Sequence, residues 1–355
     1  MSGSLLKGGY TLNKIRFNID RATGHLSDTD AKKYFSTVGF AVFALVVIQN
    51  LTSLVLSFVI SMFAPWLFDN VIISSILNLL PIYLIAVPVF IKILSRLPAV
   101  EPLSSPLGAK GWWGGLCCTV TMMMLGNYIS QVIIVWFEVM MNRQQTNPVE
   151  KMTANTPWWI NLIFIAILAP ILEELVFRKI LCRHLLPLGE GYAIILSSVI
   201  FGLCHGNLFQ FFYAFGVGLI LALIYVKTGK LIHTIIFHFV INFFGGVFAP
   251  WLITKLDLDK LYEILEDMAT TGQAAPDALL PYVKPLMLLA LYDVFMYVAA
   301  IVGAVLLFKA RKKHSLDTGI LPPPKEHKVA NIFLNTGVAA ALAAFTFVFI
   351  ASLLF

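Results

Sequence analysis

The stretch PWWINLIFIAILAPILEELVFRKILCRHL, residues 157–185, decides the fold. Its first part is uncharged and apolar over almost the length that a spanning helix needs, about 20 residues. The same helix then carries two adjacent carboxylates and a guanidinium, on Glu173, Glu174 and Arg178. Ionisable side chains are costly inside a bilayer unless they are paired or hydrated, and they usually mark function. The stretch therefore predicts a transmembrane helix that also holds a functional site.

Composition extends this interpretation to the whole chain. Hydrophobic residues make up 59% of the 355 residues and charged residues 12%, whereas a soluble domain is about 45–50% apolar and about 25% charged. So few charges cannot cover a soluble surface, and nucleic-acid binding is excluded as the main theme. We predict an all-α polytopic membrane protein with about nine transmembrane helices, at 34–64, 71–95, 112–141, 157–185, 191–206, 208–227, 231–253, 285–309 and 331–354.

Positive charge predicts the orientation. Most of the 25 Lys and Arg residues fall in segments that would be cytoplasmic if the N-terminus is, and such residues favour the cytoplasmic side. The 191–206 segment is short for a span, but omitting it would place the basic 309–328 loop outside. No apolar run lies near Met1, which predicts that there is no cleavable signal peptide. We expect an integral multi-pass protein of a type that suits a bacterial plasma membrane.

Four regions follow from this topology. Residues 1–33 form a polar cytoplasmic segment, and 34–355 form a single transmembrane helical domain whose core, 157–253, contains most of the ionisable side chains found within the spans. The longest non-spanning stretch, 254–284, would be extracytoplasmic. It contains KLDLDKLYEILEDM (255–268), whose leucines recur at helical spacing. This pattern predicts an amphipathic helix at the membrane interface.

The two glutamates should have different environments. Glu174 and Arg178 are spaced i, i+4, so they share a helix face and can pair. Glu173 points about 100° away from Glu174 and lacks such a partner. An unpaired carboxylate in a partly dry cavity could act as a base. Pro170 has no N–H and frees a helix carbonyl just before the pair, and freed backbone at membrane depth usually lines a cavity.

Two histidine segments follow within the same core. FGLCH (201–205) places Phe201 and His205 one turn apart, and HFVIN (238–242) places His238 and Asn242 one turn apart. An imidazole beside a carboxamide offers two donors that converge on one point, as an oxyanion requires. Either segment alone is more typical of helix packing than of chemistry.

Together the three segments resemble the CPBP family, which comprises the CAAX proteases and bacteriocin-processing enzymes and is also called Abi. EELVFR (173–178) matches EExxxR, FGLCH matches FxxxH and HFVIN matches HxxxN. The matching core, roughly 157–253, is under a third of the chain. The resemblance implies an intramembrane endopeptidase of the glutamate type that acts on a membrane-associated peptide or protein.

The resemblance also implies a role for each motif residue. Glu173 would activate water, assisted by His205. His238 and Asn242 would stabilise the oxyanion of the tetrahedral intermediate. Glu174 and Arg178 would shape and support the site.

Several alternatives stay open. One Glu and two His are a possible zinc set, although HExxH is absent, and we expect no cofactor. An ion-coupled transporter would use intramembrane carboxylates such as Glu138 and Asp293. A non-catalytic scaffold or immunity factor could share the same fold. For a protease, the substrate would be either a lipidated protein trimmed at its C-terminus or a small peptide.

Overall fold

The computed structural model of the chain describes residue 17 and residues 19–20, 23–154, 156–272, 276–310 and 315–354. Much of the predicted 1–33 segment therefore lies outside the described residues. Within the described part, the chain is helical apart from loops and two isolated β-bridges. The α-helices are α1 (Asp28–Phe63), α2 (Val71–Leu80), α3 (Val87–Leu94), α4 (Ala109–Met141), α5 (Pro148–Ala154), α6 (Trp158–Asn161), α7 (Ala169–Glu174), α8 (Arg183–Leu185), α9 (Glu190–Leu203), α10 (Leu208–Thr228), α11 (Leu231–Phe243), α12 (Ala249–Thr254), α13 (Leu258–Thr271), α14 (Pro276–Ala310), α15 (Lys328–Phe333) and α16 (Thr336–Leu354).

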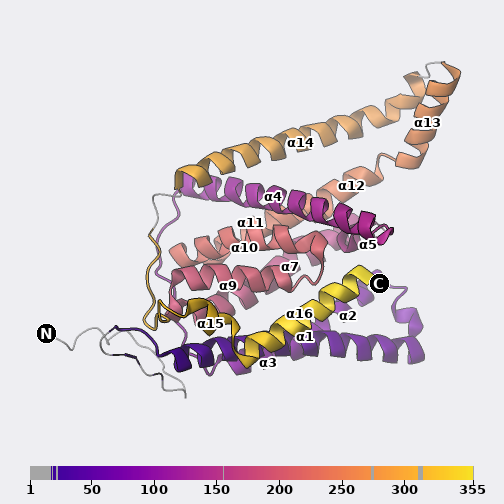
Figure 1. The fold of residues 1–355 in the computed structure, drawn as a ribbon. Helices are drawn as coiled ribbons and strands as arrows, with labels where there is room; N and C mark the ends of the chain where they lie inside the picture. The colour runs from indigo at the N-terminus through magenta and orange to yellow at the C-terminus, as the bar shows by residue number, and fades with distance from the viewer. Residues whose placement is uncertain are drawn as a thin grey trace.

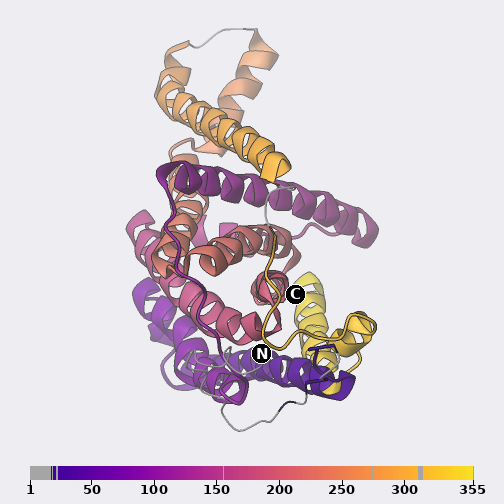
Figure 2. The same ribbon diagram turned by 90° about the vertical axis from the view of Figure 1, so that its left-hand side faces the viewer.

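These helices cross the molecule in three layers (Figures 1 and 2). Helices α4 and α14 pack together on one side, and α1 packs against α16 and α3 on the other. Helices α7 and α9–α11 lie between them. Consecutive crossings run in opposite directions, so the segments 95–108, 229–230 and 315–335 all lie at the same end as the start of α1 (Figure 1). This alternation is the predicted one, and the assignment of that end to the cytoplasm stays a prediction.

Eight helical segments of the described chain are long and apolar enough to cross a membrane. They are Asp28–Phe63, Val71–Leu94, Ala109–Met141, Trp158–Leu188, Leu208–Thr228, Leu231–Thr254, Asp277–Ala310 and Thr336–Leu354. The prediction of an all-α polytopic membrane protein is confirmed, and the chain is an integral multi-pass membrane protein.

The ninth predicted span, 191–206, differs from the expectation. Helix α9 has only 14 residues, about 21 Å at 1.5 Å per residue, whereas the hydrocarbon core is about 30 Å thick. It ends at Leu203, and the chain turns back into α10 after Gly206, which adopts a positive φ of 70°. The tip of this α9–α10 hairpin lies short of the end that α4 reaches (Figure 1).

The expected 254–284 loop is also largely helical. Helix α13 (258–271) corresponds to the predicted amphipathic helix, and its described side chains include no buried residue. Helix α14 then begins at Pro276, well before the predicted start at 285, and continues through Pro281 and Pro285. Prolines are tolerated in membrane helices, because neighbouring groups and local adjustments satisfy the freed carbonyls.

Three π-helical segments are placed by prolines. The segments Pro81–Ala86, Leu162–Leu168 and Phe244–Phe248 end two residues before Pro88, Pro170 and Pro250, respectively. The proline ring clashes with the carbonyl four residues earlier, and a wider π turn relieves that clash. Two of these segments adjoin the motif helices: Leu162–Leu168 precedes α7, and Phe244–Phe248 follows α11.

Close glycine contacts fix the central layer against α4. A Cβ on Gly126 of α4 would collide with the backbone of Phe212 and Tyr213, and a Cβ on Gly216 of α10 would meet the carbonyl of Met122. The backbones of α4 and α10 can approach this closely only because both positions are glycine. This contact places one face of α4 directly over the site.

Candidate active site

A cavity of about 600 Å³ opens among the central helices, and its lining includes residues of all three motifs. Glu173 comes from α7, His205 from the turn after α9, and His238 and Asn242 from α11. Glu173 and His238, which are 65 positions apart in sequence, therefore line the same cavity. The sequence predicted this set, and the structure brings its four proposed catalytic residues together.

Glu174 and Arg178 form the predicted i, i+4 pair beneath the cavity. Arg178 Nε donates to Glu174 Oε2 at 3.0 Å, and both side chains are completely buried. The guanidinium lies 5.1 Å from the centre of the Phe201 ring, a cation–π contact. Glu174 is thus fixed as a buried carboxylate that does not line the cavity.

Glu173 has a different environment from its neighbour. Its side chain is 24% exposed and lines the cavity, whereas that of Glu174 is not exposed at all. Glu173 Oε2 accepts no hydrogen bond from the described residues. The 100° offset between adjacent helix positions separates the two carboxylates in this way. Of the two, only Glu173 can reach a reacting molecule.

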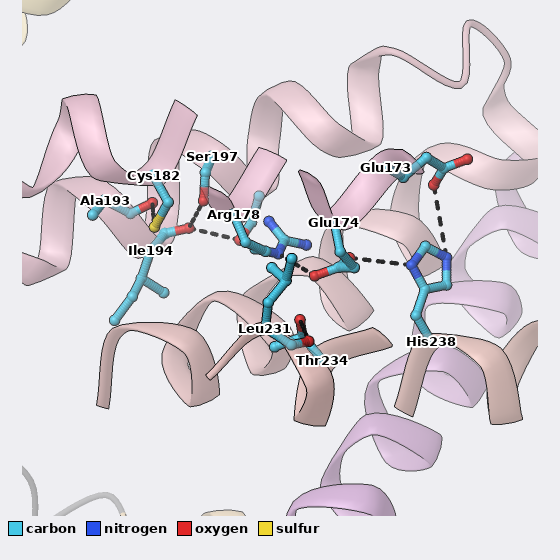
Figure 3. A network of polar contacts seen from close by, with 11 residues as sticks. Glu173, Glu174, Arg178, Cys182, Ala193, Ile194, Ser197, Leu231, Thr234 and His238 are labelled. Atoms are coloured by element: carbon cyan, nitrogen blue, oxygen red, sulfur yellow. Dashed lines mark hydrogen bonds and ion pairs between the residues drawn. The ribbon is translucent and has the colours of Figure 1, made fainter. Parts of the chain in front are cut away.

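His238 lies between the two carboxylates (Figure 3). Its Nδ1 is 3.1 Å from Glu174 Oε1, and its Nε2 is 3.7 Å from Glu173 Oε2. Because Glu174 is held as a carboxylate by Arg178, Nδ1 is the nitrogen that donates to it. Arg178, Glu174 and His238 therefore form a chain of contacts that fixes the imidazole and turns Nε2 toward Glu173.

His205 is oriented by its own backbone. Its Nδ1 is 2.9 Å from the Phe201 carbonyl oxygen, and a carbonyl only accepts, so Nδ1 carries the proton. In the neutral ring, Nε2 is then left as an acceptor. The predicted span 191–206 would place His205 next to its outer end, whereas Glu173 lies nearer the cytoplasmic end of its own predicted span, 157–185. Because α9 is short and ends inside the bundle, His205 instead lies on the same cavity as Glu173.

Phe201 connects the motifs through its ring. It makes edge-to-face contacts with His205, at 5.0 Å between ring centroids, and with His238, at 5.7 Å. The ring is 1% exposed. Such aromatic pairs contribute about 0.5–1.5 kcal/mol beyond their buried area. Phe201 thus holds both imidazoles at fixed angles and covers the guanidinium of Arg178.

Asn242 is held by the carbonyl that Pro170 frees. In the π-helical segment Leu162–Leu168, the Ile165 carbonyl faces position 170, where proline has no N–H to donate. Asn242 Nδ2 donates to that carbonyl instead, at 2.9 Å. This contact explains the proline before the glutamates. It leaves the second amide hydrogen of Asn242 free toward the cavity.

Two further carboxylates do not reach the cavity lining. Glu138 Oε1 accepts from the backbone N–H of Gln145 and so stabilises the turn after α4. Asp293 lies on α14 and is exposed. Two further polar lining residues, Asn78 on α2 and Asn127 on α4, are not ionisable. The ionisable side chains of the spans therefore do not reveal them, whereas the carboxamides within the spans would indicate both.

The described residues contain no group of three or more His, Cys, Asp or Glu side chains placed to hold a metal ion. The ring nitrogens are nevertheless of the type that binds zinc, because each Nδ1 is tied to a carbonyl or a carboxylate. The metal requirement therefore stays a prediction for experiment.

Comparison with known proteins matches the region that contains these residues. Residues 155–244 match the family model described as type II CAAX prenyl endopeptidase Rce1-like. The membrane-embedded CAAX protease MroQ of Staphylococcus aureus is 38% identical over 97 residues, which are 25% of this chain and 39% of that protein. A Bacillus subtilis protein named "Putative membrane peptidase YdiL" is 30% identical over 113 residues, 32% of this chain and 43% of that protein. No solved structure matches.

The chain spans less than half the length of each of these relatives. The family match, residues 155–244, contains all three motifs. Both relatives are bacterial membrane proteins by name. The motifs, the cavity and these matches agree on one segment. Residues 155–244 of this chain are similar to the type II CAAX prenyl endopeptidase Rce1-like family, in agreement with the resemblance of the three motifs.

Proposed function

We propose that this protein is an intramembrane endopeptidase in which Glu173 activates the attacking water. The observation that carries the proposal is the position of Glu173: it is the carboxylate on the cavity, it accepts no hydrogen bond from the described residues, and an imidazole nitrogen lies 3.7 Å from it. A general base needs to be this accessible and this uncommitted.

In the proposed reaction, Glu173 takes a proton from water while the oxygen attacks the scissile carbonyl. His205 Nε2, an acceptor in the neutral ring, helps to orient that water. The C–O bond forms and the carbonyl oxygen becomes an oxyanion. Glu173 then passes the proton to the leaving nitrogen as the C–N bond breaks, which yields a carboxylate and an amine.

The proposed oxyanion donors are His238 and Asn242. Because Nδ1 of His238 donates to Glu174, donation from Nε2 to the oxyanion requires the doubly protonated ring. Asn242 offers the amide hydrogen that is not bonded to Ile165. Donors fixed before the reaction act most strongly on the charge that develops in the transition state.

The substrate class follows from the relatives and the cavity. A CAAX protease and a membrane peptidase are the named relatives, and a cavity of about 600 Å³ is far larger than one water, which occupies about 30 Å³. We infer that the substrate is a membrane-associated peptide or protein segment. It would be either lipidated next to the cleaved bond or a small peptide without lipid.

Cleavage of two matched peptides tests this function. The purified protein in liposomes is given a quenched fluorescent peptide that ends in a farnesylated CAAX sequence, and the same peptide without the farnesyl group. We expect one of them to be cleaved at a single internal bond, located by mass spectrometry. Absence of an endoproteolytic product from both peptides would contradict the proposal.

Replacement of Asn242 by alanine is expected to lower kcat by about 10²–10³-fold, the usual loss for one oxyanion donor. KM should change little, because the charge exists only in the transition state. Steady-state kinetics on the cleaved peptide measures both constants. A variant with unchanged kcat would remove Asn242 from the oxyanion site.

We also propose that hydrolysis needs no metal. A strong chelator should then leave the rate unchanged, and elemental analysis of the purified protein should find no stoichiometric zinc. The opposite result is equally clear. One zinc per chain that is lost in both His205→Ala and His238→Ala, with activity restored by added zinc, would make these histidines metal ligands.

A further inference from the structure

The cavity extends beyond the catalytic-type residues into a region without charge. This region is lined by residues of α2, α4 and α5. Among the described lining residues of the whole cavity, Glu173 is the only acidic group, and none is Lys or Arg. A region without Lys or Arg does not suit a phosphate. Its uncharged polar groups suit a ligand that both donates and accepts hydrogen bonds.

Helix α2 turns a polar face toward this region. Ser74, Ser75 and Asn78 line the cavity at the i, i+3 and i, i+4 spacings that share a helix face. Ile72 and Ile76 are exposed elsewhere on the helix. The two serine hydroxyls are committed, since both donate to the Val71 carbonyl. Asn78 makes no hydrogen bond among the described residues.

Helix α4 presents a second free carboxamide. Asn127 follows Gly126, the residue at which α4 touches α10, so its backbone position is fixed by that contact. Its side chain lines the cavity, is exposed and has no hydrogen-bond partner in the described chain. A carboxamide without a partner at membrane depth is unfavourable unless a ligand or water satisfies it.

The other carboxamides of the lining are already used. Asn147 accepts from the Val149 N–H, and Asn161 donates toward the carbonyls of Thr153 and Thr156. Gln210 donates to the Tyr213 hydroxyl. These three support the local structure. Asn242 is a fourth, and it donates to the Ile165 carbonyl. Asn78 and Asn127 are therefore the lining carboxamides without a hydrogen-bond partner among the described residues.

We propose that Asn78 and Asn127 bind the backbone of the substrate peptide and hold it extended beside Glu173. The inference rests on the proposed endopeptidase function. A carboxamide has one acceptor and two donor hydrogens, so it can pair with the N–H and the C=O of a peptide unit. An extended substrate inside the membrane has no other partners for these groups, and leaving them unpaired is costly. The two asparagines are positioning residues that recognise backbone and not side chains.

Leucine substitutions test the pair, because leucine keeps the volume and removes the hydrogen bonds. Asn78→Leu and Asn127→Leu should each lower kcat/KM about tenfold, and the double variant about a hundredfold, as expected for a peptide group left unpaired. Asn50→Leu is the matched control. Asn50 is a membrane-embedded asparagine on α1 that donates to the Val46 carbonyl and does not line the cavity, so its replacement should leave kcat/KM unchanged.

Backbone-modified substrate separates a contact with the peptide from a structural role. The amides near the cleaved bond are N-methylated one at a time. Methylation of the amide whose N–H donates to Asn78 or Asn127 should slow cleavage by the parent enzyme. The same modification should cost the corresponding leucine variant little. In Asn78→Ser and Asn127→Ser, the hydroxyl can still bind water, but the side chain is too short to contact the substrate backbone. These variants should therefore lose activity as the leucine variants do.

The outcomes are distinct. Leucine or serine variants that cleave as fast as the parent, or N-methyl penalties that are equal in parent and variants, would overturn the inference and leave the proposed function intact. A parent enzyme that cleaves neither peptide would refute the proposed function itself. Thermal midpoints of all variants are measured in parallel. If a leucine variant unfolds, cleavage of the N-methylated substrates by the serine variant tests the inference in its place.

Discussion

Replacement of Arg178 by alanine is expected to destabilise the protein by about 3–5 kcal/mol, the usual cost of breaking a buried ion pair. Arg178 and Glu174 are both fully buried, with 3.0 Å between Nε and Oε2. Without the guanidinium, Glu174 is left as a buried charge whose only polar partners among the described residues are the ring of His238 and the side chain of Thr234. The thermal midpoint of the purified protein in detergent should fall clearly, and cleavage should fall with it because His238 is no longer fixed.

The control for Arg178→Ala lies about one turn further along the same segment. Arg183 pairs with Glu101, but their side chains are 28% and 63% exposed. Exposed ion pairs contribute about 0–1 kcal/mol, so Arg183→Ala should shift the midpoint little. A third variant, Glu174→Gln with Arg178→Met, removes both charges and should regain part of the stability. An Arg178→Ala protein as stable as the parent would contradict the buried pair.

Spacing within one helix was sufficient to predict much of the site. The i, i+4 separation of Glu174 and Arg178 predicts their pair, and the 100° offset predicts that Glu173 is left free. Pro170 predicts a freed carbonyl. These properties depend only on helical geometry, which the apolar composition of the span makes certain. The roles of the residues in the reaction stay predictions.

Properties that depend on how helices are placed against each other could not be predicted in this way. The depth of His205 depends on where α9 stops, and only the short stretch 204–207 separates the apolar residues of α9 from those of α10. The early start of α14 was hidden by Pro281 and Pro285, which resemble loop residues in sequence. The acceptor of Asn242 lies 77 residues away, on a carbonyl that is exposed by a π turn. Only tertiary packing settles these three features.

Replacement of Glu173 by glutamine is expected to lower kcat by about 10²–10⁴-fold, the contribution of a general acid–base group. Glutamine keeps the shape of the side chain and cannot accept the proton of water. Folding should be almost unaffected, because Glu173 Oε2 accepts no hydrogen bond among the described residues. An ion-coupled transporter would lose flux from the same change, and a non-catalytic scaffold would lose nothing.

Glu138→Gln is the matched control for this change. Glu138 is a second glutamate within a predicted span, and it is not among the cavity-lining residues. The glutamine carbonyl can still accept from the Gln145 N–H, so the turn after α4 is preserved. Both variants remove one carboxylate from a membrane helix, and they differ in whether that carboxylate reaches the cavity.

The most direct measurement is the initial rate of peptide cleavage in liposomes by the parent, Glu173→Gln and Glu138→Gln proteins, at equal protein amounts and with thermal midpoints recorded. The account predicts that Glu138→Gln cleaves like the parent and that Glu173→Gln is at least about a hundredfold slower with an unchanged midpoint. A Glu173→Gln protein that cleaves at a rate near that of the parent would contradict the account.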